Sequence, residues 1–122
     1  MIETLEDQKA IGFIRYTIIS FPDADIPYPE IGYGIAEVNE RGKGYACEAV
    51  KLLVNYLFDG YPCERVAAMV DTENLPSIKV LEKIGFQREG VLRRATFRDG
   101  KWTDLAMYSL IRGDHQKGDV KC

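Results

Sequence analysis

One Gly-rich segment, where the hydrophobic period changes, constrains the fold of this chain more than any other feature. Residues 31–38 (IGYGIAEV) have the composition of a β-strand, whereas from Ala46 onward the apolar residues recur at helical spacing. The linking segment is Arg41-Gly42-Lys43-Gly44-Tyr45-Ala46. A strand that passes into a helix across two glycines is predicted to make a tight turn whose backbone lies open to a ligand.

This strand-turn-helix unit has the chemistry of an anion site. The first turn of the helix presents backbone N–H groups and the positive end of the helix dipole, and Arg41 and Lys43 add positive charge. We therefore predict a pyrophosphate cradle. The segment has no Gly-Lys-Ser/Thr ending of a phosphate-binding loop and lacks the third glycine of a dinucleotide fingerprint. A plain tight turn remains the alternative, and a nucleotide hydrolase is disfavoured because no Mg²⁺-binding carboxylate stands in context.

The rest of the chain alternates between strand and helix patterns. The predicted strands cover residues 9–20, 31–38, 65–70, 91–97 and 103–110, and residues 1–5 are expected to pair with the first of them. The first helix is predicted to end at Gly60, and the second to run from its cap Asn74 to Gly85. Residues 21–30, with three prolines, are predicted to form a loop, and Asp99-Gly100 a hairpin turn. This order predicts an α+β (α/β-like) domain around a mixed sheet.

Length and charge exclude several classes of protein. The 122 residues fit a single domain, predicted to cover residues 1–113 and to be followed by a polar tail, 114–122. The formal net charge of −3 offers no basic face for nucleic acid. No apolar run is long enough for an export signal or a membrane span, so neither a membrane nor a nucleic acid is expected as a partner.

The cysteines and the single histidine are predicted to be structural or solvated. Cys47 and Cys63 fall in apolar runs and are expected to be buried thiols, while Cys122 ends the polar tail. Three cysteines without a close pair predict neither a disulfide framework nor a metal site, and reduced cysteines favour the cytoplasm. His115 lies in the tail and is predicted to be solvated rather than catalytic.

The sequence resembles the GNAT superfamily of N-acetyltransferases in two motifs. Arg41-x-x-Gly44-x-Ala46 matches the signature (Gln or Arg)-x-x-Gly-x-(Gly or Ala) that binds the pyrophosphate of coenzyme A. Residues 74–86 (NLPSIKVLEKIGF) resemble the branch that acetylates the N-termini of ribosomal proteins, and residues 89–93 and 99–104, Tyr108 and Leu110 continue that pattern. The resemblance extends from about Ile11 to Arg112. It implies acetyl-CoA as cosubstrate, transfer of its acetyl group to a primary amine, and no metal.

The resemblance also implies how the cosubstrate binds. In the GNAT fold a mixed, mostly antiparallel sheet with flanking helices contains two parallel strands, here residues 31–38 and 65–70, which splay apart at one end. The pantetheine arm enters the gap and satisfies the backbone groups that the gap leaves unpaired. The implied cofactor-binding residues are Val38, Arg41, Gly42, Lys43, Gly44, Tyr45, Ala46 and Asn74.

The amine must attack the thioester as the free base, which calls for a proton acceptor and for a proton donor to the leaving thiolate. By its distance from the cradle, Glu30 matches the glutamate base of histone-type members, although an ordinary strand-edge carboxylate is an equal alternative. Ser77 matches the serine donor of the ribosomal branch, against a plain first-turn helix serine. Tyr33 is expected either to line the acceptor site or, more often for an aromatic at strand spacing, to belong to the core.

Three departures from the family qualify this interpretation. The position that often carries the tyrosine acid is Leu81, and the position of the ribosomal branch's glutamate is Thr96. Members usually begin with a strand and two helices before the strand at residues 9–20, so the fold is expected to be N-terminally truncated. A homodimer is expected to protect the exposed sheet edge. The acceptor is expected to be a protein N-terminus or a small-molecule amine, and the alternative is a catalytically weak or inactive coenzyme A-binding module.

Overall fold

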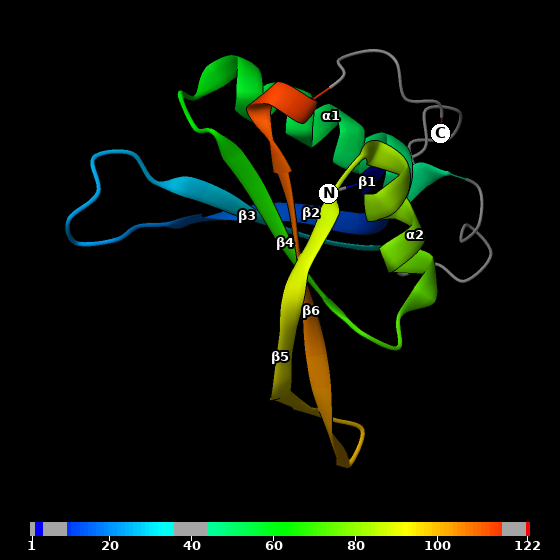
Figure 1. Cartoon of the computed structure of the whole chain (residues 1–122). Helices are drawn as coiled ribbons and strands as arrows, with labels where there is room; N and C mark the ends of the chain where they lie inside the picture. Colours follow the sequence, from blue (N-terminus) through cyan, green and yellow to red (C-terminus); the bar gives the residue numbers. More distant parts are fainter. Residues whose placement is uncertain (1, 4–9, 36–43, 116–121) are drawn as a thin grey trace.

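The computed structural model describes residues 2–3, 10–35, 44–115 and 122, and their strands form one six-stranded sheet in the order β1-β2-β3-β4-β6-β5 (Figure 1). The strands are β1 (Ile2–Glu3), β2 (Ala10–Ile19), β3 (Tyr28–Ile35), β4 (Arg65–Asp71), β5 (Gln87–Arg98) and β6 (Lys101–Ile111). The helices are α1 (Tyr45–Gly60), α2 (Leu75–Ile84) and the short 3₁₀ helix η2 (Arg112–Asp114). Among these strands only β3 and β4 pair in parallel. The predicted α+β class with a mixed, mostly antiparallel sheet is confirmed.

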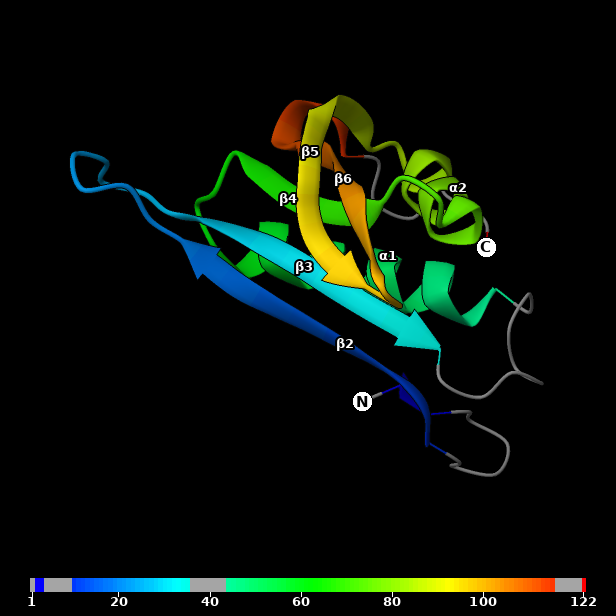
Figure 2. The same ribbon diagram turned by 90° about the horizontal axis from the view of Figure 1, so that it is seen from below.

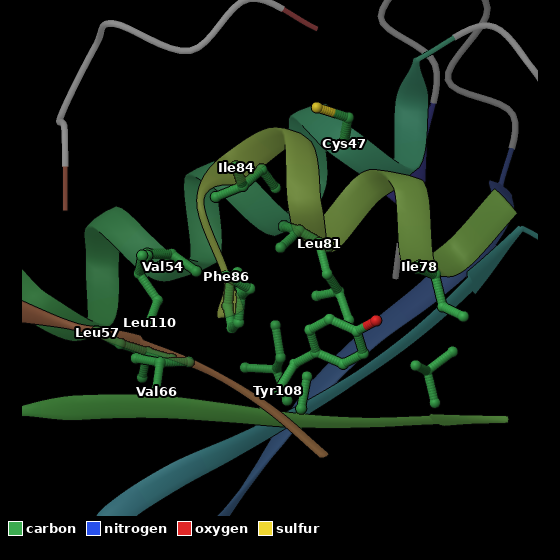
Figure 3. Packing of buried hydrophobic residues seen from close by; sticks show 14 of the residues in the cluster. Cys47, Val54, Leu57, Val66, Ile78, Leu81, Ile84, Phe86, Tyr108 and Leu110 are labelled. Carbon is green, nitrogen blue, oxygen red and sulfur yellow. The ribbon is translucent and has the colours of Figure 1, made fainter. Parts of the chain in front are cut away.

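Both long helices pack on one face of the sheet. Val54 and Leu57 of α1 and Leu81 of α2 are buried together with Tyr108 of β6, as Figure 3 shows from close by. Val50 of α1 belongs to the same buried cluster. Side chains alternate between the two faces of a strand, so Ile31, Ala68 and Tyr108, which pair across β3, β4 and β6, share this helix face.

The other face of the sheet carries no helix among the described residues, and we call it the open face. Figure 2 shows strands on the near side and α1 behind them. By pairing, Thr17, Glu30, Ala67 and Ser109 form a row across this face. The two faces therefore offer a substrate two different approaches.

The hairpin of β5 and β6 follows its predicted turn. Asp99 and Gly100 have φ angles of 53° and 79°, the left-handed pair that a two-residue type I′ turn requires. A bulge between Leu92 and Thr96 contains Arg94, whose backbone N–H donates to Asp104 Oδ1 at 2.7 Å. Beyond the bulge the hairpin projects away from the rest of the sheet (Figure 1).

One expectation about where an element begins needs correction. Strand β3 begins at Tyr28, not at Ile31, because residues 28–30 pair with β2 and so belong to the sheet rather than to the predicted loop. The predicted turn after residues 1–5 and the predicted strand end at Val38 lie outside the described residues. The pairing of β1 with β2, through Ile2 opposite Gly12, is confirmed.

The cysteine prediction is wrong for two of the three residues. Cys47 and Cys122 form a disulfide with a Cα–Cα distance of 5.6 Å, whereas Cys63 is a buried free thiol as expected. The bonded pair is separated by 75 positions in sequence. Spacing along the chain carries no information about such a pair, because it is the fold that brings the two residues together.

The prediction that His115 is solvated is also wrong. Its ring lies 4.9 Å from that of Phe58, its Nε2 is 2.6 Å from Asn55 Oδ1, and the side chain is half-buried. The guanidinium of Arg112 donates to the backbone carbonyls of Phe58, Tyr61 and Cys63, and so fastens this segment to the end of α1. Such carbonyls lack helical partners, which makes a helix end a favourable place for an arginine.

Candidate functional site

The parallel strands β3 and β4 separate partway along their length. Their pairing is limited to Glu30 opposite Ala67 and Ile31 opposite Ala68. Beyond these pairs, residues 32–35 of β3 and 69–71 of β4 continue as strand without ladder partners across the gap among the described residues. The predicted splay is confirmed, and it offers an extended ligand two rows of backbone hydrogen-bonding groups.

The N-terminus of α1 stands at the end of the segment that follows β3. Gly44 is its N-cap, with a φ of 82° and no side-chain hydrogen bond to the first turn. A glycine adopts this left-handed conformation without steric cost, and it leaves the N–H groups of the first turn, from Tyr45 and Ala46 onward, without a side-chain cap. Of the predicted cradle, Val38, Arg41, Gly42 and Lys43 lie outside the described residues.

Cys122 lies against this same helix start. A Cβ placed on Gly44 would come within 3.0 Å of the backbone carbonyl oxygen of Cys122. The disulfide joins Cys122 to Cys47 in the first turn of α1. Cys122 therefore lies in the space over the first turn of α1 where the predicted anion would bind, and the two would compete for it.

The N-terminus of α2 is organised differently. Asn74 Oδ1 accepts the backbone N–H of Ser77 at 3.3 Å, so Asn74 is the predicted helix cap. Ser77 is half-buried, and its Oγ donates to Tyr33 Oη at 2.9 Å. In return, Tyr33 Oη donates to the backbone carbonyl of Ser77 at 3.0 Å. Desolvation by burial raises the pKa of Tyr33 to about 12, and the hydrogen bond from Ser77 opposes that rise.

Tyr33 is the site residue that sequence reasoning undervalued. It lies two residues beyond Ile31, so its side chain is the first on the helix face after the strands part. Its ring packs against the core, as predicted for an aromatic at strand spacing, but its hydroxyl reaches the first turn of α2. The even spacing from Ile31 indicated the face, although no local pattern indicated the partner.

Glu30 lies on the other side of β3. It is half-buried in the open-face row between Thr17 and Ala67, inside the strand rather than just before it. The structure therefore places the two proposed catalytic residues, Glu30 and Ser77, on opposite faces of the splayed strand. A ligand threaded through the gap would have one of them on each side.

One arginine of this face, Arg65 of β4, is already paired. Arg65 Nη2 donates to Glu89 Oε1 at 2.7 Å, and its guanidinium lies 4.8 Å from the centre of the Tyr28 ring. The hydrogen bond from Arg65 holds the pKa of Glu89 below its usual value. Because Arg65 is committed to Glu89, the structure does not give Glu30 this cation as a partner.

The two departures from the family motifs have structural explanations. Leu81 is fully buried in the core between α2 and the sheet, so the position often occupied by an acid serves packing here. Thr96 Oγ1 lies 2.6 Å from Thr103 Oγ1 in the projecting part of the β5–β6 hairpin. Neither residue replaces Ser77 or Glu30 at the splay.

An open recess of about 590 Å³ is lined by Val91, Leu92, Arg93 and Arg94. Leu92 pairs with Leu105, and Leu105 pairs with Asp71 at the splayed end of β4, so Leu92 belongs to the open face. The recess lies two strands away from the gap and has a mixed apolar and cationic lining.

Among the described residues no group of three or more His, Cys, Asp or Glu side chains is arranged to hold a metal ion. No helix there is long and apolar enough to cross a bilayer.

Residues 1–87 match the acetyltransferase (GNAT) domain family, which covers the splay, the start of α1 and the whole of α2. The chain belongs to the GNAT family of acetyltransferases. Its sheet order and its splayed parallel pair are those of the GNAT fold.

Relatives in sequence include proteins named as N-acetyltransferases. The chain is 37% identical over 110 residues to the uncharacterised N-acetyltransferase p20 of Bacillus licheniformis, which covers 90% of this chain and 60% of that protein. It is 28% identical to the [ribosomal protein uS5]-alanine N-acetyltransferase of Escherichia coli, over 72% of this chain and 45% of that protein. The GNAT chain therefore spans about half to three fifths of the length of these relatives.

Solved structures agree with this assignment. Mycobacterium smegmatis RimJ in complex with CoA-disulfide superimposes with a TM-score of 0.78 and 28% identity, over 88% of this chain and 50% of that one. A probable acetyltransferase superimposes with a TM-score of 0.76 and 32% identity, over 88% of this chain and 57% of that one. The match to RimJ places this GNAT chain near the ribosomal-protein branch that its motifs resemble.

Proposed function

We propose that this GNAT chain transfers the acetyl group of acetyl-CoA to a primary amine by direct attack on the thioester. The observation that carries the proposal is the coincidence at one place of a splayed parallel pair, an uncapped helix N-terminus and a held hydroxyl. The splayed strands suit the extended pantetheine arm, and the uncapped helix N-terminus suits a pyrophosphate. The held hydroxyl suits a leaving thiolate.

The cosubstrate would be held mainly by main-chain groups. The N–H groups of Tyr45 and Ala46, after the left-handed Gly44, suit the pyrophosphate, with Arg41, Gly42 and Lys43 completing the cradle and Val38 the end of the strand. The unpaired edges of β3 and β4 suit the amides of the pantetheine arm. Asn74 lies beside this path, although its side chain is engaged in capping α2.

The chemical roles follow from the two faces of β3. Glu30 accepts the proton of the amine arriving over the open face, directly or through water. The amine lone pair then forms the C–N bond, and the C–S bond breaks with its electron pair on sulfur. Ser77, on the helix face, donates its hydroxyl hydrogen to that sulfur and regains a hydrogen from water, while the nitrogen of the new amide releases its remaining extra proton to water. The placement of Glu30 and Ser77 on opposite faces supports this division of labour, because one residue can serve the attacking nitrogen while the other serves the departing sulfur.

The acceptor proposed is a protein N-terminus or a small-molecule amine. The motifs of α2 and the similarity to a protein named as a ribosomal-protein alanine N-acetyltransferase favour a protein N-terminus. The recess beside Leu92 lies on the same open face as Glu30 and is a suitable place for the acceptor's flanking residues. A cytoplasmic location is part of the proposal, and it predicts that the Cys47–Cys122 bond is reduced there.

A coenzyme A-binding module without turnover is the second candidate, and the burial of Leu81 in the core favours it. The two are separated by measuring acetyl-CoA binding by isothermal titration, with ATP as a control, followed by release of free thiol with a panel of amines and alanine-ended peptides. In an enzyme, Ser77→Ala and Glu30→Gln lower turnover about tenfold or more while acetyl-CoA affinity is kept. Binding without thiol release from any amine would establish the module instead.

We also propose a homodimer for this chain. The order of the sheet leaves β1 and β5 at its edges, and an exposed edge strand invites pairing with another chain. Light scattering at micromolar concentration is expected to give the mass of two chains. A mass of one chain across the concentration range would contradict the proposal.

A further inference from the structure

We propose that Tyr33 is a positioning residue, which holds the Ser77 hydroxyl at the splay and supports it as Ser77 donates to the leaving sulfur. This inference rests on the proposed acetyl transfer and adds a residue that the motifs do not assign. Tyr33 acts through Ser77 and has no proposed contact with the reacting atoms.

The first support is the reciprocal pair of hydrogen bonds. Ser77 Oγ donates to Tyr33 Oη at 2.9 Å, while Tyr33 Oη donates to the Ser77 carbonyl at 3.0 Å. With the bond from Ser77 N–H to Asn74 Oδ1, the backbone donor, backbone acceptor and hydroxyl of Ser77 are all held from outside the residue. A first-turn serine without a catalytic role needs only the backbone bonds.

The second support is where these bonds lie. Tyr33 and Ser77 are 44 positions apart, and their contact joins the splayed part of β3 to the helix that follows β4. Within the described part of the chain, this pair of side chains therefore links the splayed end of β3 to α2 on the helix face. The contact holds β3 and α2 at a fixed separation, and in the proposed function the thioester lies beside both.

The third support is the direction in which the hydrogens can turn. When the Ser77 hydroxyl turns toward a thiolate, its oxygen becomes an acceptor, and the Tyr33 hydroxyl is within 2.9 Å to donate to it. The hydrogen bond from Tyr33 to the Ser77 carbonyl is then broken, and that carbonyl stays in place as part of α2. Because burial raises the pKa of Tyr33 to about 12, the phenol stays protonated and remains a donor throughout the neutral range.

The test is a double-mutant cycle of Tyr33→Phe and Ser77→Ala, with turnover and acetyl-CoA affinity measured separately. Each single variant is expected to lower kcat at least about tenfold, within the roughly 10²- to 10⁴-fold that a positioned acid-base group contributes, with the Kd for acetyl-CoA changed less than about twofold. The double variant is expected to be no slower than the slower single one, because Tyr33 acts only through the Ser77 hydroxyl and has no further effect once that hydroxyl is gone. Tyr56→Phe removes a hydroxyl from an exposed tyrosine of α1 and is expected to leave both constants unchanged.

Two results would overturn the inference. One is a Tyr33→Phe variant with the kcat of the wild type, and the other is a double variant whose loss is the product of the two single losses. A wild-type protein that binds acetyl-CoA but acetylates no amine would overturn the proposed function and the catalytic role of Tyr33 together. A spectrophotometric tyrosine titration then tests the burial of Tyr33: a tyrosine should titrate near pH 12, and it should be missing from Tyr33→Phe.

Discussion

The two helix starts beside the splay are built in opposite ways. Helix α1 begins at Gly44, which has no side chain to offer its first turn, whereas α2 begins at Asn74, whose amide oxygen caps Ser77. The backbone of α1 is left for something outside the helix, while α2 is satisfied from within and is joined to β3 through Tyr33. The difference teaches that a helix N-terminus suits a ligand only where its own caps are absent, and that a capped start is suited to holding a side chain still.

The largest expected effect comes from giving the α1 start a side chain. Gly44→Ala forces a left-handed residue to carry a Cβ, at about 1 to 2 kcal/mol, and places that atom where the pyrophosphate would approach. Acetyl-CoA affinity is expected to fall at least tenfold in isothermal titration under reducing conditions. Gly60→Ala is the control, because it lies at the other end of α1 and its Cβ would meet nothing within 4 Å. Equal affinity in the two variants would mean that α1 does not bind the cosubstrate.

The next effect comes from the disulfide at the same helix start. Because the Cys122 carbonyl lies against Gly44, the oxidised chain is expected to bind acetyl-CoA several-fold more weakly than the reduced chain. Removing the bond is expected to lower the free energy of unfolding by roughly 2 to 4 kcal/mol, since it closes a long loop. Affinity and stability should therefore change in opposite directions.

Titrations with and without dithiothreitol, each with a urea melt, measure both changes. Cys122→Ser is expected to reproduce the reduced chain without reductant, whereas Cys63→Ala, at the free buried thiol, should leave acetyl-CoA affinity as it was. The same affinity before and after reduction would show that Cys122 does not compete with the cosubstrate.

The smallest effect is expected at the α2 start. Asn74→Ala removes the oxygen that accepts the Ser77 N–H, and loss of such a cap costs about 1 kcal/mol of stability. Urea unfolding measures it, and Asn74→Ser, which keeps an accepting oxygen, should recover most of the loss. An alanine variant as stable as the wild type would mean that Tyr33 alone holds this helix start.

Much of the fold could be predicted from local patterns. The helix of residues 45–60, the cap at Asn74, the left-handed Gly85 and the turn at Asp99-Gly100 all follow from propensities that act within a few residues. Strand boundaries were less certain, as at Tyr28, because a strand extends as far as its neighbour lets it pair.

The candidate site, like the fold, could be predicted from the sequence where it depends on local patterns and not where it depends on tertiary contacts. Its motifs were visible because a glycine turn and a capped serine are local arrangements, and the GNAT signature is a short run of residues. The positions of Glu30 and Ser77 relative to each other could not be predicted from the sequence. They depend on which face of β3 each residue meets after the whole sheet has formed.

The sequence by itself determined the order of strands and helices, the Gly-rich start of α1 and the family to which the chain belongs, since these depend on spacing along the chain. Only the tertiary structure decided that Tyr33 meets Ser77, that Cys122 lies over Gly44, that Glu30 faces away from both, and that His115 packs on Phe58. The physical reason is that each of these contacts joins residues tens of positions apart. Their proximity arises from burying both helices on one face of the sheet, and no local preference encodes it.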